Sequence, residues 1–84
     1  MFRLGRFQFG FVKYSHCDFR LSQLSSYNYQ NVEEALADLP GVSCGINVAT
    51  RMVRVSYLPA SYHPSTFLRA LEAAGFDVEP WGCA

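Results

Sequence analysis

The sequence has no excess of charge of either sign and little charge in total. Its 84 residues include seven Lys or Arg and seven Asp or Glu, so only 17% are charged. This balance argues against a nucleic-acid partner, because proteins that bind nucleic acids usually carry a basic excess. No apolar run approaches the ~18 residues of a membrane-spanning helix. Half of the residues are hydrophobic, which excludes long disorder and predicts one small domain.

The first 16 residues differ in composition and pattern from the rest of the chain. Aromatic residues alternate there with basic and polar ones, and from Phe7 to Phe11 the alternation favours a strand. A secretory signal would need a longer apolar region and a small-residue cleavage site, and we find neither. We predict a basic-aromatic extension at residues 1–16, part disordered and part an added strand, and a domain at residues 17–84. A patch that contacts a membrane surface or a partner is the alternative.

The body of the chain alternates between patterns typical of strands and of helices. Apolar residues at every second position indicate strands, and those three or four apart indicate helices. Gly41 and Gly75 stand where two helices should end, because glycine accepts a left-handed turn. The predicted elements are a strand from Asp18 to about Gln23, a helix at Tyr29–Leu39, strands at Val42–Val48 and Met52–Tyr57, a helix from Pro64 to about Ala74, and a strand from Phe76 that Pro80 closes.

This order of elements predicts an α+β fold. Strand, helix, strand, strand, helix, strand is the split βαβ, or ferredoxin-like, arrangement. Right-handed crossovers make the first strand parallel to the second and the third parallel to the fourth. We therefore expect a four-stranded antiparallel sheet in the order 4-1-3-2, with both helices on one face.

Three strings of the chain carry a resemblance to a known family: VEEALADLPGV (Val32–Val42), INVATRMVRVSY (Ile46–Tyr57) and LEAAGFDVE (Leu71–Glu79). They resemble the heavy-metal-associated domain, the module of copper chaperones and of the N-terminal tails of soft-metal P-type ATPases. The family has similar strings: VExxLxxLPGV at the end of its first helix, VNxATxxVxVxY in its hairpin and AxxAGY at the end of its second helix. The resemblance covers about Asp18 to Glu79 and implies the same ferredoxin-like fold.

The resemblance also implies a place for a metal. Family members hold a soft ion such as Cu(I) with two cysteines in a GMxCxxC loop between the first strand and the first helix. Here that loop reads SQLSSYNYQ and has no cysteine. Counting back from the LPG string at 39–41 puts Ser25 and Asn28 at the two cysteine positions. Counting forward from the strand puts Ser26 and Tyr29 there instead.

Neither pair suits Cu(I), because soft ions prefer sulfur ligands. We therefore predict that the loop binds metal weakly or not at all. Leu24 stands where the family has a methionine, and Phe76 stands where it has an aromatic residue beside the loop. We expect Phe76 to pack in the core under the loop. Ser25 and Ser26 are also residues of the kind that caps a helix.

Three cysteines lie outside this loop, and none belongs to a CxxC pair. The predicted topology puts all three at the end of the sheet opposite the loop. Cys17 and Cys83 are on neighbouring strands and should lie close together, whereas Cys44 is on the far edge strand. Three interpretations stay open: unlinked thiols with Cys44 packed as a small hydrophobic residue, a disulfide or redox pair of Cys17 and Cys83, or a metal site built from His16, Cys17 and Cys83.

Three further features have a structural and a functional interpretation. We expect His63 at the start of the second helix rather than as a metal ligand. We expect Trp81 to cover an edge of the core, with a partner contact as the alternative. The acidic residues of the first helix form either a solvated face or a docking surface for a basic partner; they are Glu33, Glu34 and Asp38.

No catalytic set is recognisable, so the segment is not expected to be an enzyme, and any ATPase activity would lie outside it. The resemblance implies a cytoplasmic N-terminal domain of a copper-type P-type ATPase, a regulatory or docking module in metal binding and transport. Its partners would be a copper chaperone or other domains of the ATPase, and a downstream region would reach the membrane. The alternatives are a metal-free interaction domain, for example a homodimer, and a binder of Cu(I) or another soft metal through Cys17, Cys83 and His16.

Overall fold

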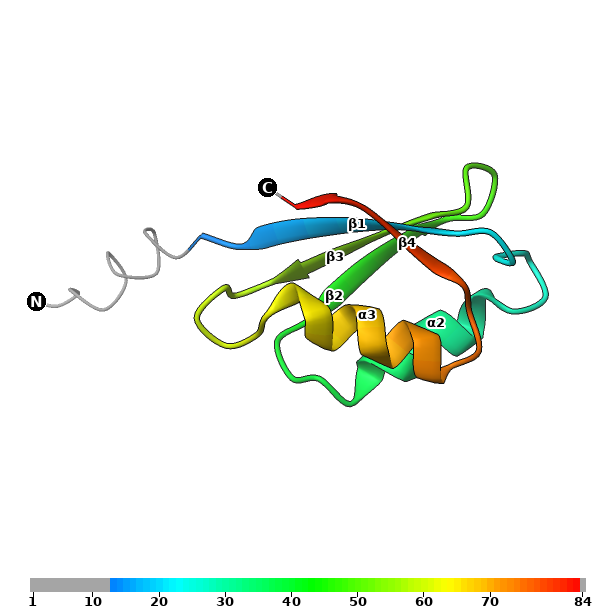
Figure 1. The fold of residues 1–84 in the computed structure, drawn as a ribbon. Helices are drawn as coiled ribbons and strands as arrows, with labels where there is room; N and C mark the ends of the chain where they lie inside the picture. Colours follow the sequence, from blue (N-terminus) through cyan, green and yellow to red (C-terminus); the bar gives the residue numbers. More distant parts are fainter. Residues whose placement is uncertain (1–12, 84) are drawn as a thin grey trace, which may run out of the picture.

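The computed structural model describes residues 13–83 and has the predicted order of elements (Figure 1). The elements are β1 (Ser15–Leu21), α2 (Tyr29–Ala37), β2 (Ser43–Asn47), β3 (Met52–Tyr57), α3 (Pro64–Ala73) and β4 (Val78–Cys83). The strands form one sheet in the order β2-β3-β1-β4, and every neighbouring pair is antiparallel. Both helices lie on the same side of the sheet (Figure 1). The predicted ferredoxin-like fold is therefore confirmed.

The core lies between the sheet and the two helices. Side chains of a strand point alternately to the two faces of its sheet, and in β1 every second side chain, beginning with Cys17, is buried. Phe67 and Leu71 of α3 are fully buried against this face. The buried residues are Cys17, Phe19, Leu21, Leu24, Val32, Leu36, Val53, Val55, Tyr57, Phe67, Leu71 and Phe76.

β1 begins earlier in the chain than predicted. Its first residues pair with β3, with Ser15 opposite Tyr57 and Cys17 opposite Val55. Cys17 is small and apolar and faces the core, so it extends the strand pattern by one further inward position. Residues 1–12, which contain most of the predicted extension and its expected strand, lie outside the described residues.

β4 continues to Cys83, so the prediction that Pro80 closes the last strand was wrong. β4 is an edge strand, where a proline without an N–H is tolerated. Its pairing with β1 shifts just after Pro80, which leaves Trp81 as the extra residue of a bulge. Trp81 is 60% exposed, so the prediction that it covers an edge of the core was also wrong.

Both helices are followed by glycines in the left-handed conformation, as predicted. The φ angles are 79° at Gly41 and 99° at Gly75. α2 ends at Ala37 rather than at Leu39, because a residue that precedes a proline is disfavoured in the helical conformation. Within residues 13–83, no helix combines the length and the apolar character needed to cross a membrane.

An ion pair joins β1 to β3 on the face of the sheet that the helices leave open. Arg54 Nε donates to Asp18 Oδ1 at 2.8 Å, and Arg54 Nη2 donates to Asp18 Oδ2 at 3.1 Å. This hydrogen bonding lowers the pKa of Asp18 below its ordinary value of 3.8. The pair therefore favours the folded state whenever Asp18 is ionised.

We expect Arg54→Met to destabilise the domain except at strongly acidic pH. The pKa of Asp18 is lower in the folded state than in the unfolded state. The ion pair therefore stabilises the domain at a pH above the unfolded-state pKa, and this stabilisation is lost as the pH falls through the folded-state pKa. Urea unfolding should show a difference in stability between wild type and variant that is present at neutral pH and shrinks as the pH falls below 3.8, the ordinary pKa of Asp18. A difference that does not change with pH would contradict this role of the pair.

Candidate metal loop and cysteine pair

The loop that joins β1 to α2 is held together by hydrogen bonds of its own residues. The Ser25 N–H donates to Asn28 Oδ1 at 2.8 Å, and Asn28 Nδ2 donates to the carbonyl oxygen of Gln23 at 2.7 Å. The Tyr27 N–H donates to Ser25 Oγ at 3.2 Å. The side-chain amide of Asn28 therefore bridges two backbone positions of the loop.

Two contacts attach the loop to the rest of the domain. Leu24 is buried in the core, and its N–H donates to the carbonyl oxygen of Leu21 at 3.0 Å. Gln23 Oε1 accepts a hydrogen bond of 2.6 Å from the N–H of Asp77, which follows α3. Phe76, the residue before it, is buried in the core as expected. The loop is thus attached both to the core, through Leu24, and to the segment after α3, through Gln23.

α2 begins at Tyr29 as predicted, but no serine side chain caps it. Asn28 occupies the N-cap position, and its side chain makes no hydrogen bond to the helix. Its amide is already used within the loop. Ser25 contributes its carbonyl oxygen, which accepts from the Tyr29 N–H at 3.1 Å. The prediction of a serine cap at Ser25 or Ser26 was therefore wrong.

The candidate ligand positions of the loop offer only neutral oxygen and nitrogen atoms. Ser25 and Asn28 are joined across the loop by the hydrogen bond described above. Ser26 and Tyr29 line a hollow of about 270 Å³ beside β2, and Cys44 lines it too. Hard, neutral donors bind a soft ion poorly, so neither pair forms a strong site for Cu(I) by its own chemistry.

Cys44 is half-buried and is not in a disulfide. Burial, and to a smaller extent the nearby carboxylate of Glu33, raises the pKa of the Cys44 thiol. The thiol is therefore protonated at neutral pH, and a metal would have to displace this proton, because the thiolate is the ligand.

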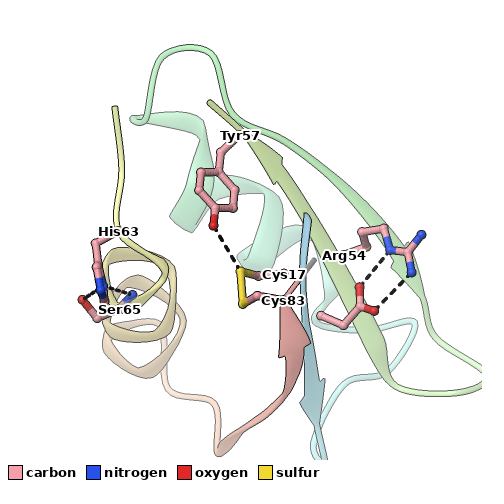
Figure 2. The surroundings of a disulfide bond; sticks show 7 residues. Cys17, Arg54, Tyr57, His63, Ser65 and Cys83 are labelled. Carbon is pink, nitrogen blue, oxygen red and sulfur yellow. Dashed lines mark hydrogen bonds and ion pairs between the residues drawn. A yellow bond between two sulfur atoms is a disulfide. The ribbon is translucent and has the colours of Figure 1, made fainter. Parts of the chain in front are cut away.

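At the end of the sheet opposite the loop, Cys17 and Cys83 form a disulfide (Figure 2). They are 66 residues apart in the sequence but lie directly opposite each other on β1 and β4, with their Cα atoms 4.0 Å apart. Cys17 is fully buried, whereas Cys83 is exposed. Of the three interpretations of the cysteines, the structure has the linked pair.

Tyr57 is a neighbour of this disulfide that the sequence analysis did not identify. Its hydroxyl lies 3.4 Å from Cys17 Sγ (Figure 2). Its ring packs against Phe67, with the ring centroids 4.8 Å apart. The alternation of β3 could have indicated this contact. Val55 lies opposite Cys17, and Tyr57, two residues further along β3, faces the core on the same side of the sheet.

His16 does not join the cysteine pair in this structure. Adjacent residues of a strand point to opposite faces of the sheet. His16 is on the open face, where its Nδ1 lies 3.0 Å from Ser56 Oγ. Within residues 13–83, no three His, Cys, Asp or Glu side chains lie close enough together to hold a metal ion. A site that uses His16 with Cys17 and Cys83 would require β1 to change its twist or pairing.

The other residues singled out from the sequence lie at helix surfaces. His63 is the N-cap residue of α3, and its Nδ1 accepts from the Ser65 N–H at 3.2 Å, as expected for a residue at the start of this helix (Figure 2). Glu33, Glu34 and Asp38 are all exposed on α2 or at its C-terminal end. They form an acidic surface, which we call the α2 acidic face.

The fold agrees with comparisons to known families. The sequence model of the heavy-metal-associated domain matches residues 29–77, more than half of the chain. The chain therefore belongs to the heavy-metal-associated domain family. The match begins at Tyr29, after most of the loop. Among curated proteins, none matches the chain.

Several solved structures share the fold. The N-terminal domain of PacS from Synechocystis PCC6803 is 28% identical, with a TM-score of 0.67, and the match covers 80% of this chain and 97% of that one. Oxidised MerP from Ralstonia metallidurans CH34 is 18% identical, with a TM-score of 0.72 and coverage of 81% and 97%. The N-terminal domain of a potential copper-translocating P-type ATPase from Bacillus subtilis, in its Cu(I)-loaded state, is 20% identical, with a TM-score of 0.75 and coverage of 86% and 92%.

Replacing Asn28 by alanine should loosen the loop. The substitution removes two hydrogen bonds between side chain and backbone, each of which contributes about 1 kcal/mol net, so we expect a loss of about 1–2 kcal/mol in the free energy of unfolding. Urea denaturation measures this loss. Ser26→Ala is the matched control in the same loop and should change stability by less than about 0.5 kcal/mol. Equal effects of the two substitutions would contradict the bridging role of Asn28.

Restoring two cysteines should restore a metal site. In a chain that carries Cys83→Ser, we expect the double substitution Ser25→Cys and Asn28→Cys to bind one tightly held Cu(I). The reason is that these two positions already approach each other across the loop, and two thiolates suit a soft ion. The comparison variant is Ser26→Cys with Tyr29→Cys, measured by the same competition against a Cu(I) chelator. Tight binding by the comparison variant alone would establish the other register.

Proposed function

We propose that this domain is the N-terminal module of a soft-metal P-type ATPase of the copper type, on the cytosolic side of the membrane. It acts in metal transport as a docking or regulatory module, and its loop binds metal weakly or not at all. Any ATP hydrolysis and the membrane passage belong to a region downstream of the domain. The module includes all of β1, because Ser15 and His16 already pair with β3. The extension therefore ends before Ser15 and is shorter than the 16 residues expected from the sequence.

The loop is the observation that carries this proposal. At each possible pair of ligand positions the chain has neutral oxygen or nitrogen donors where the family has thiols. The amide of Asn28 already bridges the loop through Ser25 and Gln23. A metal ion that entered the loop would have to break these bonds and would gain only weak ligands. A module that keeps the fold but not this ligand set is better suited to recognising a partner than to carrying an ion.

The comparisons support the proposed context. Two of the three solved structures named above are N-terminal domains, and one of these belongs to a potential copper-translocating P-type ATPase and holds Cu(I). The identity to the PacS domain is 28%, and this chain covers 97% of it. Domains of this size and fold therefore occur at the start of larger metal-handling proteins.

The α2 acidic face is the surface that we assign to docking. Its three carboxylates are exposed, and within residues 29–38 there is no basic residue to neutralise them. Charges of this kind steer a partner of opposite charge and fix its orientation more than they raise affinity. The expected partner is a copper chaperone, or another domain of the ATPase, that presents a basic surface.

Charge reversal on the α2 acidic face should weaken docking to such a partner. We expect Glu34→Lys to lower the association rate with the organism's copper chaperone and to flatten its dependence on salt. Glu72→Lys, an equal change of charge at an exposed position of α3, is the matched control and should leave both unchanged. Stopped-flow or surface plasmon resonance at two salt concentrations measures the association rate and its dependence on salt. Failure of the wild-type domain to bind the chaperone, or equal effects of the two variants, would contradict the proposal.

A full-length transcript provides an independent check of the context. We expect the reading frame to continue into membrane-spanning segments and an aspartyl-phosphate motif. A stop codon directly after this domain would instead favour a free-standing interaction protein.

A further inference from the structure

The two sulfur atoms at the end of the sheet are held in a defined geometry that the loop does not offer. β1 is paired on both sides, with β3 and with β4, so Cys17 is fixed in the middle of the sheet. Cys83 is the last residue of the edge strand β4 and is exposed. One cysteine is therefore buried in the middle of the sheet, and its partner is exposed at the end of an edge strand.

We propose that Cys17 and Cys83, once reduced, form a two-thiolate site for a soft monovalent ion such as Cu(I). Such ions select thiolate ligands over oxygen donors, and two thiolates are a sufficient ligand set for Cu(I). Reduction lengthens the distance between the sulfur atoms, and a shift of Cys83 at the end of β4 makes room for the ion. The site does not depend on the proposed ATPase context, because it rests on these two residues alone.

A small-molecule thiol of the glutathione class opens the site in two steps. Its thiolate attacks the exposed Cys83 sulfur, the bond between the two cysteines breaks, and Cys17 leaves as a thiolate with the electron pair. A second small-molecule thiolate attacks the small-molecule sulfur of the mixed disulfide and releases Cys83 as a thiolate. Two thiols are thereby oxidised to one small-molecule disulfide, the protein gains two electrons, and the protons of the consumed thiols pass to water or to the new cysteine thiolates.

The hydroxyl of Tyr57 stabilises the thiolate of Cys17, which burial alone would disfavour. The Tyr57 hydroxyl, 3.4 Å from Cys17 Sγ, donates a hydrogen bond to the thiolate once it forms. The Tyr57 ring is only 4% exposed and is held by Phe67, so the donor stays in place. The apolar residues around it keep water away from the buried sulfur. Tyr57 is thus a positioning residue for this site rather than a ligand.

The third cysteine does not belong to the site. Cys44 lies opposite Val55, and Val55 lies opposite Cys17, so Cys44 is two strands away from the pair. Neighbouring strands are about 5 Å apart, which places Cys44 about 10 Å from Cys17. Cys44 therefore provides an internal control with the same chemistry.

The test is a Cu(I) titration against a calibrated competing chelator. The reduced domain should hold one equivalent, and the domain with its disulfide intact should hold none. Cys83→Ser should abolish tight binding, and Cys44→Ser should leave it unchanged. Cys83 is exposed, so its replacement should leave the fold intact, which circular dichroism checks.

The substitution Tyr57→Phe tests whether the Tyr57 hydroxyl supports the metal site or whether only the packing of the ring matters. It keeps the ring and removes the hydroxyl, and we expect it to weaken Cu(I) binding by about tenfold while the fold is retained. No binding by the reduced wild type, or binding that survives Cys83→Ser and is lost with Cys44→Ser, would overturn the proposal. Docking to the copper chaperone would be unaffected by that outcome, so failure of this site and failure of the proposed function are separable.

Discussion

The pairing of β1 with both of its neighbours is the constraint on which the rest of the structure depends. β1 lies between β3 and β4, and its side chains alternate strictly. Cys17, Phe19 and Leu21 enter the core, while His16 and Asp18 face the open side. A shift by one residue would reverse every one of these positions. The same register sets the start of the loop at one end and the cysteine pair at the other.

Groups of different chemical character lie at the two ends of β1. After Leu21 the chain enters a loop that an amide side chain bridges and that offers neutral donors. At the start of β1, Cys17 meets Cys83 on the neighbouring strand, with the Tyr57 hydroxyl beside it. The loop has no cysteine, and the two cysteines that lie together in this chain are at the opposite end of the sheet. We propose that partner recognition and metal chemistry are separated in the same way.

Much of the fold could be predicted because it follows from local patterns. The helical spacing of Val32 and Leu36 and the alternation of Val53 and Val55 place these residues in the core by period alone. Gly41 and the other helix-terminating glycine have the expected positive φ. The continuation of β4 past Pro80 was missed, because a local signal cannot show that a strand lies at the edge of its sheet.

The site could be predicted only in part. The absence of cysteine from the loop and the closeness of Cys17 to Cys83 follow from the sequence and the topology. The bridging amide of Asn28 does not, because it depends on the path of the loop between two fixed ends. The exposure of Trp81 depends on a bulge that one irregular pairing creates. The contact of Tyr57 with Cys17 needed the register of two strands.

Mapping the position of Cu(I) on the reduced domain by NMR is the most direct test of this separation. One equivalent of Cu(I) is added to the ¹⁵N-labelled protein, and the amide shifts are compared residue by residue. We predict that the largest shifts fall on Cys17, Tyr57 and Cys83, and that residues 23–29 of the loop stay unchanged. Shifts concentrated in that loop, with the cysteine pair unaffected, would contradict the assignment of the metal chemistry to the end of the sheet that holds the disulfide.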